Sequence, residues 1–492
     1  MKHRSPRIGI SKIFFALNTS CSAPRRFPRA FEEVTLQKPR RSIPSKKANT
    51  KRALKRDQVK SVRVSEFEPA VLLEPHTFRP FDPWLTTNRR FLHVVAENVT
   101  ASYEESAPRK RRMKAQDRAN LETIIKALLA NVAFGIATGN DCPNITVSLR
   151  APKRKISRYD RRGFALLPRV LEGLASRGSL IELRKSHQRG IASSFTPAAS
   201  LASEIKRFRL GPEHFAWERG TETIRLSVSR RNFARKSKDV ELIDYEDTEE
   251  TVALREDMER LNGFLRTAKF MFEHDGGPPV LTTHRDLVRH FKMSEHDQPR
   301  FDLGGRMFNG WWQELPSNRR HAIRINGEPI ADLDFSSAFL RLAFIEAGIE
   351  APAGDLYARI PKVDAGLYRD GIKQIVSAML FRETPLSRIP SELKQRLPRG
   401  MTGAEIRDAV LSAFPELSDV FATGLGLRLM FRESQIMLRS LLRLAELNVP
   451  AMNMHDGLMV QRSKADIAAR EMTNAALETV GAPLPIVLKS QY

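Results

Sequence analysis

The stretch from residue 330 to residue 341, Ile-Ala-Asp-Leu-Asp-Phe-Ser-Ser-Ala-Phe-Leu-Arg, constrains the fold more than any other part of the chain. Its first half has apolar residues around two aspartates and follows a turn cluster, Asn-Gly-Glu-Pro, which predicts a short strand. Ser336 or Ser337 can cap a helix, and apolar residues then follow at helical spacing up to Phe344. The sequence therefore predicts a strand that ends near Asp334, facing the open N–H groups of a helix start. A divalent cation or phosphate oxygens suit such a position.

A second acidic residue lies in a predicted hairpin nearer the C-terminus. Two short apolar runs flank Asp456-Gly457, and Asp-Gly is the strongest short-range signal for a hairpin turn. If this hairpin lies beside the strand that carries Asp334, two carboxylates meet at one end of a sheet. Such a pair can bind two Mg²⁺ ions, which stabilise the attacking and leaving oxygens of a phosphoryl displacement. The alternative is that both are ordinary turn residues.

A predicted helix between these two segments carries positive charge on one face. Residues 368–381 contain Arg369, Lys373, Ser377 and Phe381 at a spacing of four, so two cations and an aromatic ring share that face. This arrangement suits a nucleotide, with its triphosphate on the cations and its base on the ring. The alternative is a helix with a solvated basic face.

In order and type, these segments resemble motifs A, B and C of the family A DNA polymerases. The first motif of that family reads Asp-Tyr-Ser-Gln-Ile-Glu-Leu-Arg, and residues 334–341 read Asp-Phe-Ser-Ser-Ala-Phe-Leu-Arg. The third motif reads His-Asp-Glu, where residues 455–457 read His-Asp-Gly. Gly305-Arg306 followed by Gln313-Glu314-Leu315-Pro316 is similar to a further family segment, Gly-Arg followed by Gln-Asn-Ile-Pro. The resemblance covers about residues 300–492 and implies a palm and fingers with an antiparallel sheet and helices.

The resemblance implies a role for each matching residue. Asp334 and Asp456 would hold two Mg²⁺ ions as catalytic residues, and Lys373 would protonate the leaving pyrophosphate. The residues implied in binding the incoming deoxynucleoside triphosphate are Arg369, Lys373, Phe339, Ser377 and Phe381. The residues implied in binding the primer and template are Arg306, Gln313, Arg341, Gln435 and His455.

Several positions depart from the pattern of that family. Phe339 stands where the family has a Glu that crowds the ribose 2′-carbon, so its ring favours deoxyribonucleotides, unless it packs in the helix core. Gly457 replaces a Glu, which removes one carboxylate from the site. Ser377 replaces an aromatic residue, which leaves the stacking of base and sugar open. The interval between Asp334 and Asp456 is short for the family and indicates reduced fingers.

The charge of the chain points to a polyanionic partner. The 492-residue sequence has a formal net charge of +24, and residues 1–60 hold seventeen Lys and Arg against three Asp and Glu. Nucleic acid is the partner that suits this charge, and a solvated basic tail is the alternative.

Two further features bound the class of protein. Cys21 and Cys142 are the only cysteines, which excludes a disulfide scaffold and a Cys-based zinc site. No apolar run approaches the ~20 residues that a membrane span needs, so we expect no membrane contact and a cytoplasmic, nucleoid-associated protein. Residues 1–31 contain no acidic residue and are rich in Arg and Ser, so an organellar transit peptide stays open as an alternative.

A small DNA-binding domain is predicted upstream of the polymerase-like segment. An apolar stripe indicates a helix over residues 115–134, and residues 166–196 follow the order helix, strand, basic turn, strand. That order is similar to a winged helix-turn-helix, in which one helix enters the major groove and the wing contacts phosphates. The alternative is an α+β domain with ordinary surface charge. The predicted DNA contacts are Arg161, Arg162, Arg169, Lys185 and Arg189.

Together these features predict an α+β multidomain protein. Its parts are a basic disordered tail (1–85), a winged-helix-like domain (86–218), a strand and helical linker (219–279) and a polymerase-like palm and fingers (280–492). The expected function is template-directed addition of deoxynucleotides to a primer 3′-hydroxyl, as in a replication protein of a mobile element.

Two alternatives stay open. One is a non-catalytic DNA-binding replication initiator or regulator with a degenerate palm. The other is a family B-like polymerase, because Asp334-x-x-Ser337-x-Phe339 is also similar to the Asp-x-x-Ser-x-Tyr of that family. The absence of an Asp-Thr-Asp sequence favours the first family.

Overall fold

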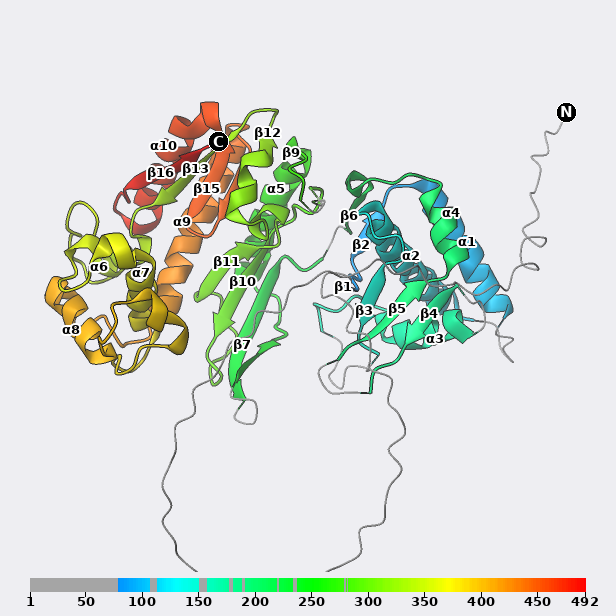
Figure 1. The fold of residues 1–492 in the computed structure, drawn as a ribbon, viewed down its shortest axis with the longest axis horizontal. Coiled ribbons are helices and arrows are strands. Elements are labelled where there is room, and N and C mark those ends of the chain that lie inside the picture. The colour runs from blue at the N-terminus through cyan, green and yellow to red at the C-terminus, as the bar shows by residue number, and fades with distance from the viewer. Residues whose placement is uncertain are drawn as a thin grey trace, which may run out of the picture. The chain divides into compact units, whose positions relative to one another are not determined.

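The computed structural model shows an α+β protein with mixed sheets, in agreement with the predicted fold class (Figure 1). It describes residues 78–106, 113–149, 157–176, 180–187, 191–218, 221–232, 237–277, 280 and 282–492. The predicted basic tail lies outside the described residues as far as residue 77. The end of that segment forms β1 (Phe78–Pro80) and begins β2 (Leu85–Thr87), whose Leu85 is buried.

The first hydrophobic core surrounds a long helix, α2 (Ala115–Ala137). Most side chains from Ile124 to Gly135 are buried, because further helices pack against α2 on several sides. These helices are α1 (Arg90–Glu105), α3 (Leu167–Ser176) and α4 (Ala199–Lys206). By length and composition, α2 is the one described helix that passes as a candidate membrane span, but most of its apolar window is buried inside the protein, as in a core helix.

A four-stranded mixed sheet in the order β1–β3–β5–β4 completes this core. Its other strands are β3 (Asn144–Val147), β4 (Ile181–Arg184) and β5 (Ser193–Pro197). β1 and β3 are parallel, and the other pairs are antiparallel. The predicted order of helix, strand, turn and strand is present in α3, β4 and β5, whereas the assignment as a winged helix stays a prediction.

The second hydrophobic core begins at Ile224 and continues to Leu484. It includes a sheet in the order β11–β10–β7–β8, a two-stranded pair β12–β9 and the helix α5. These elements are β7 (Ile224–Asn232), β8 (Ser237–Leu242), α5 (Glu249–Thr267), β9 (Phe270–Phe272), β10 (Val288–Met293), β11 (Gly304–Phe308) and β12 (Ile323–Ile325). Residues predicted as a linker, such as Leu226 and Met258, therefore belong to the same core as the polymerase-like segment. The remaining strand, β6 (Phe215–Trp217), belongs to the first core instead, where it pairs with β2.

An antiparallel sheet in the order β14–β15–β13–β16 carries the predicted site. Its strands are β13 (Ile330–Phe335), β14 (Ala451–Met454), β15 (Gly457–Gln461) and β16 (Ile486–Gln491). The helices that follow in this core are α6 (Ala338–Glu346), α7 (Ala365–Phe381), α8 (Gly403–Ala413), α9 (Gly426–Glu446) and α10 (Ala465–Val480).

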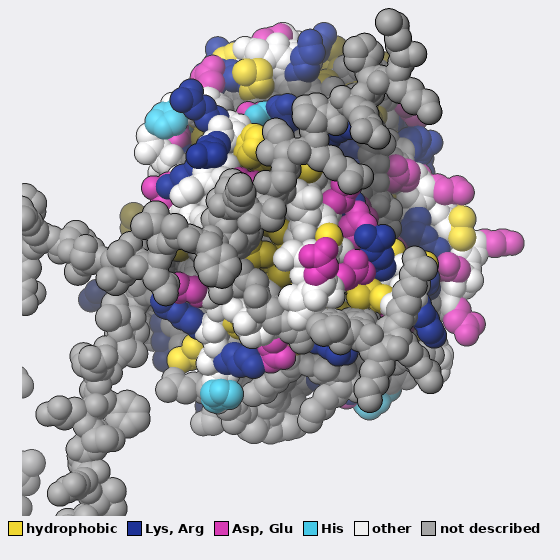
Figure 2. Space-filling view, turned by 90° about the vertical axis from the view of Figure 1, so that its right-hand side faces the viewer, with side chains coloured by type: hydrophobic (Ala, Val, Ile, Leu, Met, Phe, Trp, Pro, Cys, Tyr) yellow, Lys and Arg dark blue, Asp and Glu magenta, His cyan; other side chains and the backbone are white. Residues whose placement is uncertain are grey.

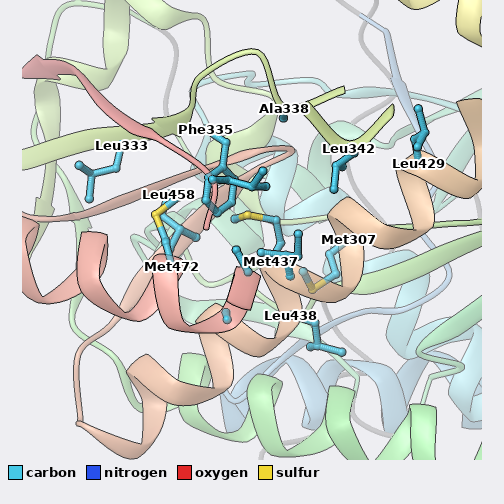
Figure 3. Packing of buried hydrophobic residues seen from close by; sticks show 14 of the residues in the cluster. Met307, Leu333, Phe335, Ala338, Leu342, Leu429, Met437, Leu438, Leu458 and Met472 are labelled. Atoms are coloured by element: carbon cyan, nitrogen blue, oxygen red, sulfur yellow. The ribbon is translucent and has the colours of Figure 1, made fainter. Parts of the chain in front are cut away.

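Alternation along β13 decides which residues face the helices. Leu333 of β13 and Leu458 of β15 are opposite each other and gather with Met437 of α9 and Met472 of α10 in one apolar layer (Figure 3). Successive side chains of a strand point to opposite faces. Asp332 and Asp334 therefore lie on the other face of β13, away from that layer.

Candidate active site

The structure brings Asp334 and Asp456 to neighbouring positions on two paired strands. Asp334 is directly opposite Gly457 in the β13–β15 register, and Asp456 precedes that glycine at the hairpin tip. The backbone N–H of Phe335 donates to the carbonyl of Asp456 at 3.2 Å, which fixes the tip against the end of β13. Burial and the charge of Asp456 raise the pKa of Asp334 to about 6. Two residues far apart in the sequence thus share one electrostatic environment.

Gly457 provides the space that the Asp334 carboxylate occupies. A Cβ atom at this position would lie 2.6 Å from the carbonyl oxygen of Leu333 and 3.0 Å from Oδ1 of Asp334. A side chain at position 457 would therefore collide with the backbone of β13. The glycine that departs from the family pattern is a requirement of this strand register.

Basic side chains lie beside each acidic group of the site. Nζ of Lys489 on β16 forms an ion pair with Asp334, and Nζ of Lys373 lies 4.0 Å from Oδ2 of Asp456. Asp332 pairs with Arg320 at 3.3 Å. Burial raises the pKa of Asp332, although Lys489 and Arg320 oppose this shift. For Lys489, partial burial lowers the pKa, but the carboxylates around it raise it above its ordinary value overall.

Asp334 and Asp456 supply two carboxylates at adjoining positions, and carboxylates are ligands that a divalent cation takes. Oδ1 of Asp334 is buried and has no hydrogen-bond partner, which leaves an acceptor atom for a further ligand. Among the described residues, no group of three or more His, Cys, Asp or Glu side chains surrounds one point. A metal here would therefore take its other ligands from backbone, water or substrate, as Mg²⁺ commonly does.

The predicted nucleotide-binding face of α7 is partly engaged within the protein. Arg369 pairs with Asp355, and its guanidinium lies 5.7 Å from the ring centre of Tyr357. The side chain of Lys373 is about half exposed and faces Asp456. Ser377 is half-buried further along the helix. The face therefore meets the aspartates at Lys373, while Arg369 has an acidic partner of its own.

Two predicted nucleotide-binding aromatic residues lie together although they come from different helices. The rings of Phe339 on α6 and Phe381 on α7 have centroids 5.8 Å apart and an interplanar angle of 31°. The guanidinium of Arg306 on β11 lies 5.4 Å from the centre of the Phe339 ring. Phe339 is half-buried, so part of its side chain is accessible.

Arg306 forms an ion pair with Glu433, whose side chain is buried. Nε and Nη2 of Arg306 donate to the two carboxylate oxygens of Glu433 on α9, at 2.6 and 3.0 Å. The Glu433 side chain is 1% exposed, and its burial raises its pKa to about 7 against the opposing effect of Arg306. Glu433 was not predicted as a site residue, because an acid within an amphipathic helix gives no sequence signal of its buried partner.

Two predicted primer or template contacts, Arg341 and Gln313, make hydrogen bonds within the protein. Arg341 is buried and donates to the carbonyls of Ser336, Pro352 and Gly354, so its guanidinium holds a loop in place. The Gln313 side chain donates from Nε2 to the carbonyl of Met307 and accepts from the N–H of Gly310. Both side chains satisfy backbone groups of neighbouring segments, which a motif match cannot reveal.

The remaining predicted primer contacts are His455, which directly precedes Asp456, and Gln435 on α9. His455 stands at the hairpin tip with a positive φ of 57°, and its ring contacts Phe308 edge to face at 5.7 Å. Burial, and then the charge of Arg306, lower the pKa of His455, which favours the neutral imidazole. Gln435 is half-buried on α9.

The predicted DNA contacts of the first core differ in exposure. Arg162 and Arg169 are exposed, and Lys185 is exposed and paired with Glu172. Arg161 is mostly buried, and its guanidinium lies over the rings of Trp84 and Phe164. Arg189 lies outside the described residues.

No model of a known protein family matches the sequence, and no curated protein matches it. The motifs and the geometry of the site therefore carry the functional assignment.

Proposed function

We propose that this chain is a template-directed DNA polymerase that transfers a deoxynucleotide to a primer 3′-hydroxyl. The observation that carries the proposal is the convergence of Asp334 and Asp456 at adjoining strand ends, with Lys373 of α7 at 4.0 Å. Polymerases of the two-metal type need two acidic ligands and a cation near the leaving group. When bound, two Mg²⁺ ions would lower the pKa of the primer hydroxyl and neutralise charge on the α-phosphate.

Other residues of the chain are assigned to proton donation, to selection of the sugar and to contact with the primer. Lys373 is exposed and close to Asp456, so it is the proton donor for the pyrophosphate that leaves. The paired rings of Phe339 and Phe381 form an aromatic wall where the sugar lies, and their bulk disfavours a ribose 2′-hydroxyl. Arg306, beside the Phe339 ring, and His455, which directly precedes Asp456, are proposed to contact the primer terminus.

The first core is proposed to bind DNA as well. Arg169 is exposed on α3, and Arg162 is exposed in the segment before that helix. Lys185 is exposed directly after β4, in the β4–β5 hairpin. Contacts of this kind bind phosphates without reading sequence. DNA affinity of the whole chain should therefore fall steeply with salt, because each neutralised phosphate releases counterions.

Primer extension by the full chain with Mg²⁺ tests the proposal. Asp334→Ala and Asp456→Ala should each lower the extension rate by about 1,000-fold, because they remove groups that stabilise charge in the transition state. Asp141→Ala, which removes an exposed aspartate of the first core, is the control and should extend normally. Equal extension by all four proteins would end the catalytic assignment.

A second candidate is a DNA-binding replication initiator or regulator with an inactive palm. The pairing of Arg369 with Asp355 and of Lys489 with Asp334 favours it, because both contacts occupy groups that a nucleotide or metal would use. It predicts salt-sensitive DNA binding with no extension by the wild-type chain.

A further inference from the structure

Lys489 occupies an irregular position in the sheet of the site. In the β13–β16 register Asp332 is opposite Ser490 and Leu333 is opposite Leu488, so Lys489 is the unpaired residue of a β-bulge. Bulges of this kind redirect a side chain relative to a regular ladder. Val487 is opposite Asp334, and residues two apart on a strand share a face. Lys489 therefore lies on the aspartate face, beside the stretch from Asp332 to Asp334.

The ammonium group of Lys489 is bound to one oxygen of Asp334. Nζ contacts Oδ2 in an ion pair, whereas Oδ1 of the same carboxylate is buried without a hydrogen-bond partner. A metal bound through the free Oδ1 would share this carboxylate with the ammonium group on Oδ2. The two positive charges would then lie close together and repel, so they compete for Asp334.

The surroundings allow the Lys489 side chain to leave. Its side chain is 51% exposed, so the ammonium can move into water without being buried elsewhere. The carboxylate of Asp334, by contrast, is fixed on a central strand between β15 and β16. Exchange of cations at this site would move Lys489 and leave the aspartate in place.

We propose that Lys489 is a built-in counter-ion of the acidic pair, which holds Asp334 in place before metal binds and must be displaced by the first divalent cation. This inference rests on the proposed function, because it assigns the metal to the same carboxylates. Lys489 is a positioning residue that acts through Asp334. Its presence raises the metal concentration that the site requires.

Direct binding of Mn²⁺ to the full-length chain tests this inference, with the free Mn²⁺ measured by electron paramagnetic resonance. Lys489→Met removes the charge and keeps much of the side-chain length, so it should lower the Mn²⁺ dissociation constant by about tenfold, as expected for loss of a competing charge-assisted contact. Lys489→Arg keeps the charge and should bind Mn²⁺ as the wild type does. Lys126→Met is the matched control, because it breaks an ion pair of 2.5 Å with Glu122 in the first core.

The outcomes separate the two levels of the proposal. Equal or weaker Mn²⁺ binding by Lys489→Met than by the wild type overturns the role of Lys489. Asp334→Asn should abolish the tight site, and undiminished Mn²⁺ binding by that variant overturns the metal site and the proposed function with it. If Asp334→Asn loses binding while Lys489→Met matches the wild type, the polymerase proposal stands and only the counter-ion role fails.

Discussion

The two hydrophobic cores of this chain place their acidic residues differently. In the first core, Glu122 pairs with Lys126 and Asp141 pairs with Lys206 at the protein surface. On the face shown in Figure 2, basic and acidic side chains are intermixed in the same way. In the second core, the acids Asp332, Asp334 and Glu433 are buried, and each has a basic partner; these partners are Arg320, Lys489 and Arg306.

The difference shows where the chain accepts a cost in stability. Removing a carboxylate from water costs several kcal/mol, and its partner rarely recovers more than that cost. Exposed ion pairs cost little and contribute about 0–1 kcal/mol. Burial of three acids around one sheet end is therefore poor evidence for stability. It is instead what a site needs when it must hold cations or polarise a substrate in a region of low water content.

The largest expected effect concerns the pair of Arg306 and Glu433. Arg306→Met leaves Glu433 buried without its partner and should lower the free energy of unfolding by about 3–5 kcal/mol at pH 8. Arg118→Met, which breaks an exposed pair with Glu104 in the first core, should cost less than about 1 kcal/mol. Urea unfolding followed by tryptophan fluorescence measures both.

Replacing both partners, as in Arg306→Met with Glu433→Met, should recover most of the free energy of unfolding that Arg306→Met loses. A double variant as unstable as the single variant would contradict this account.

A smaller effect is expected in the pH dependence of stability. Because burial raises the pKa of Glu433 from 4.5 to about 7, the folded chain binds a proton that the unfolded chain releases between these pH values. This contribution is fully present below pH 4.5 and is lost as pH rises to about 7, by up to about 3 kcal/mol. Glu433→Gln should remove it.

The measurement is the difference between the two proteins in urea unfolding from pH 5 to pH 8. Burial lowers the pKa of His290 from 6.5 to about 4, so that residue contributes the opposite slope between those values, in both proteins alike. Parallel stability curves for the wild type and Glu433→Gln would show that Glu433 stays ionised in the folded chain.

The sequence predicted best those structural features that depend on residues close together in the chain. The strand that ends at Phe335 and the presence of a hairpin around Asp456 both follow from local turn and alternation signals. The two-residue turn itself is His455-Asp456, one residue before the predicted Asp456-Gly457, because Gly457 already pairs with Met454 as the first residue of β15. The α+β class and the helix at residues 115–137 follow from periodicity in the same way.

Partners distant in the sequence could not be predicted. The bulge that exposes Lys489 to Asp334 depends on how β16 docks at the edge of the sheet. Burial of Glu433 depends on which face of α9 meets β11, and the use of Arg341 on backbone carbonyls depends on a loop that follows α6. Such contacts are set by tertiary packing, which residue spacing does not encode.

A third effect on stability tests whether Asp334 depends on the space that Gly457 leaves beside its carboxylate. Gly457→Ala should lower the free energy of unfolding by about 1–3 kcal/mol, because its Cβ would meet the carbonyl of Leu333, which cannot move without disturbing β13. Gly263→Ala on α5 meets no atom within 4 Å and should instead stabilise the chain by about 0.5–1 kcal/mol. Urea unfolding of both variants checks this. A neutral Gly457→Ala would mean that the strand register at the site is loose.

The smallest effect on stability is expected for the exposed ion pairs of the first core. Its dependence on salt tests whether burial distinguishes the acids of the two cores. Lys126→Met should change the free energy of unfolding by about 0.5 kcal/mol or less, since the pair with Glu122 is an i, i+4 contact on the surface of α2. This small contribution should decrease further in 1 M NaCl, because both side chains are in contact with solvent ions and the Debye length falls to about 3 Å. The destabilisation by Arg306→Met should persist in the same salt, because Glu433 is not in contact with solvent ions. Equal salt sensitivity of the two variants would mean that burial is not what distinguishes the acids of the two cores.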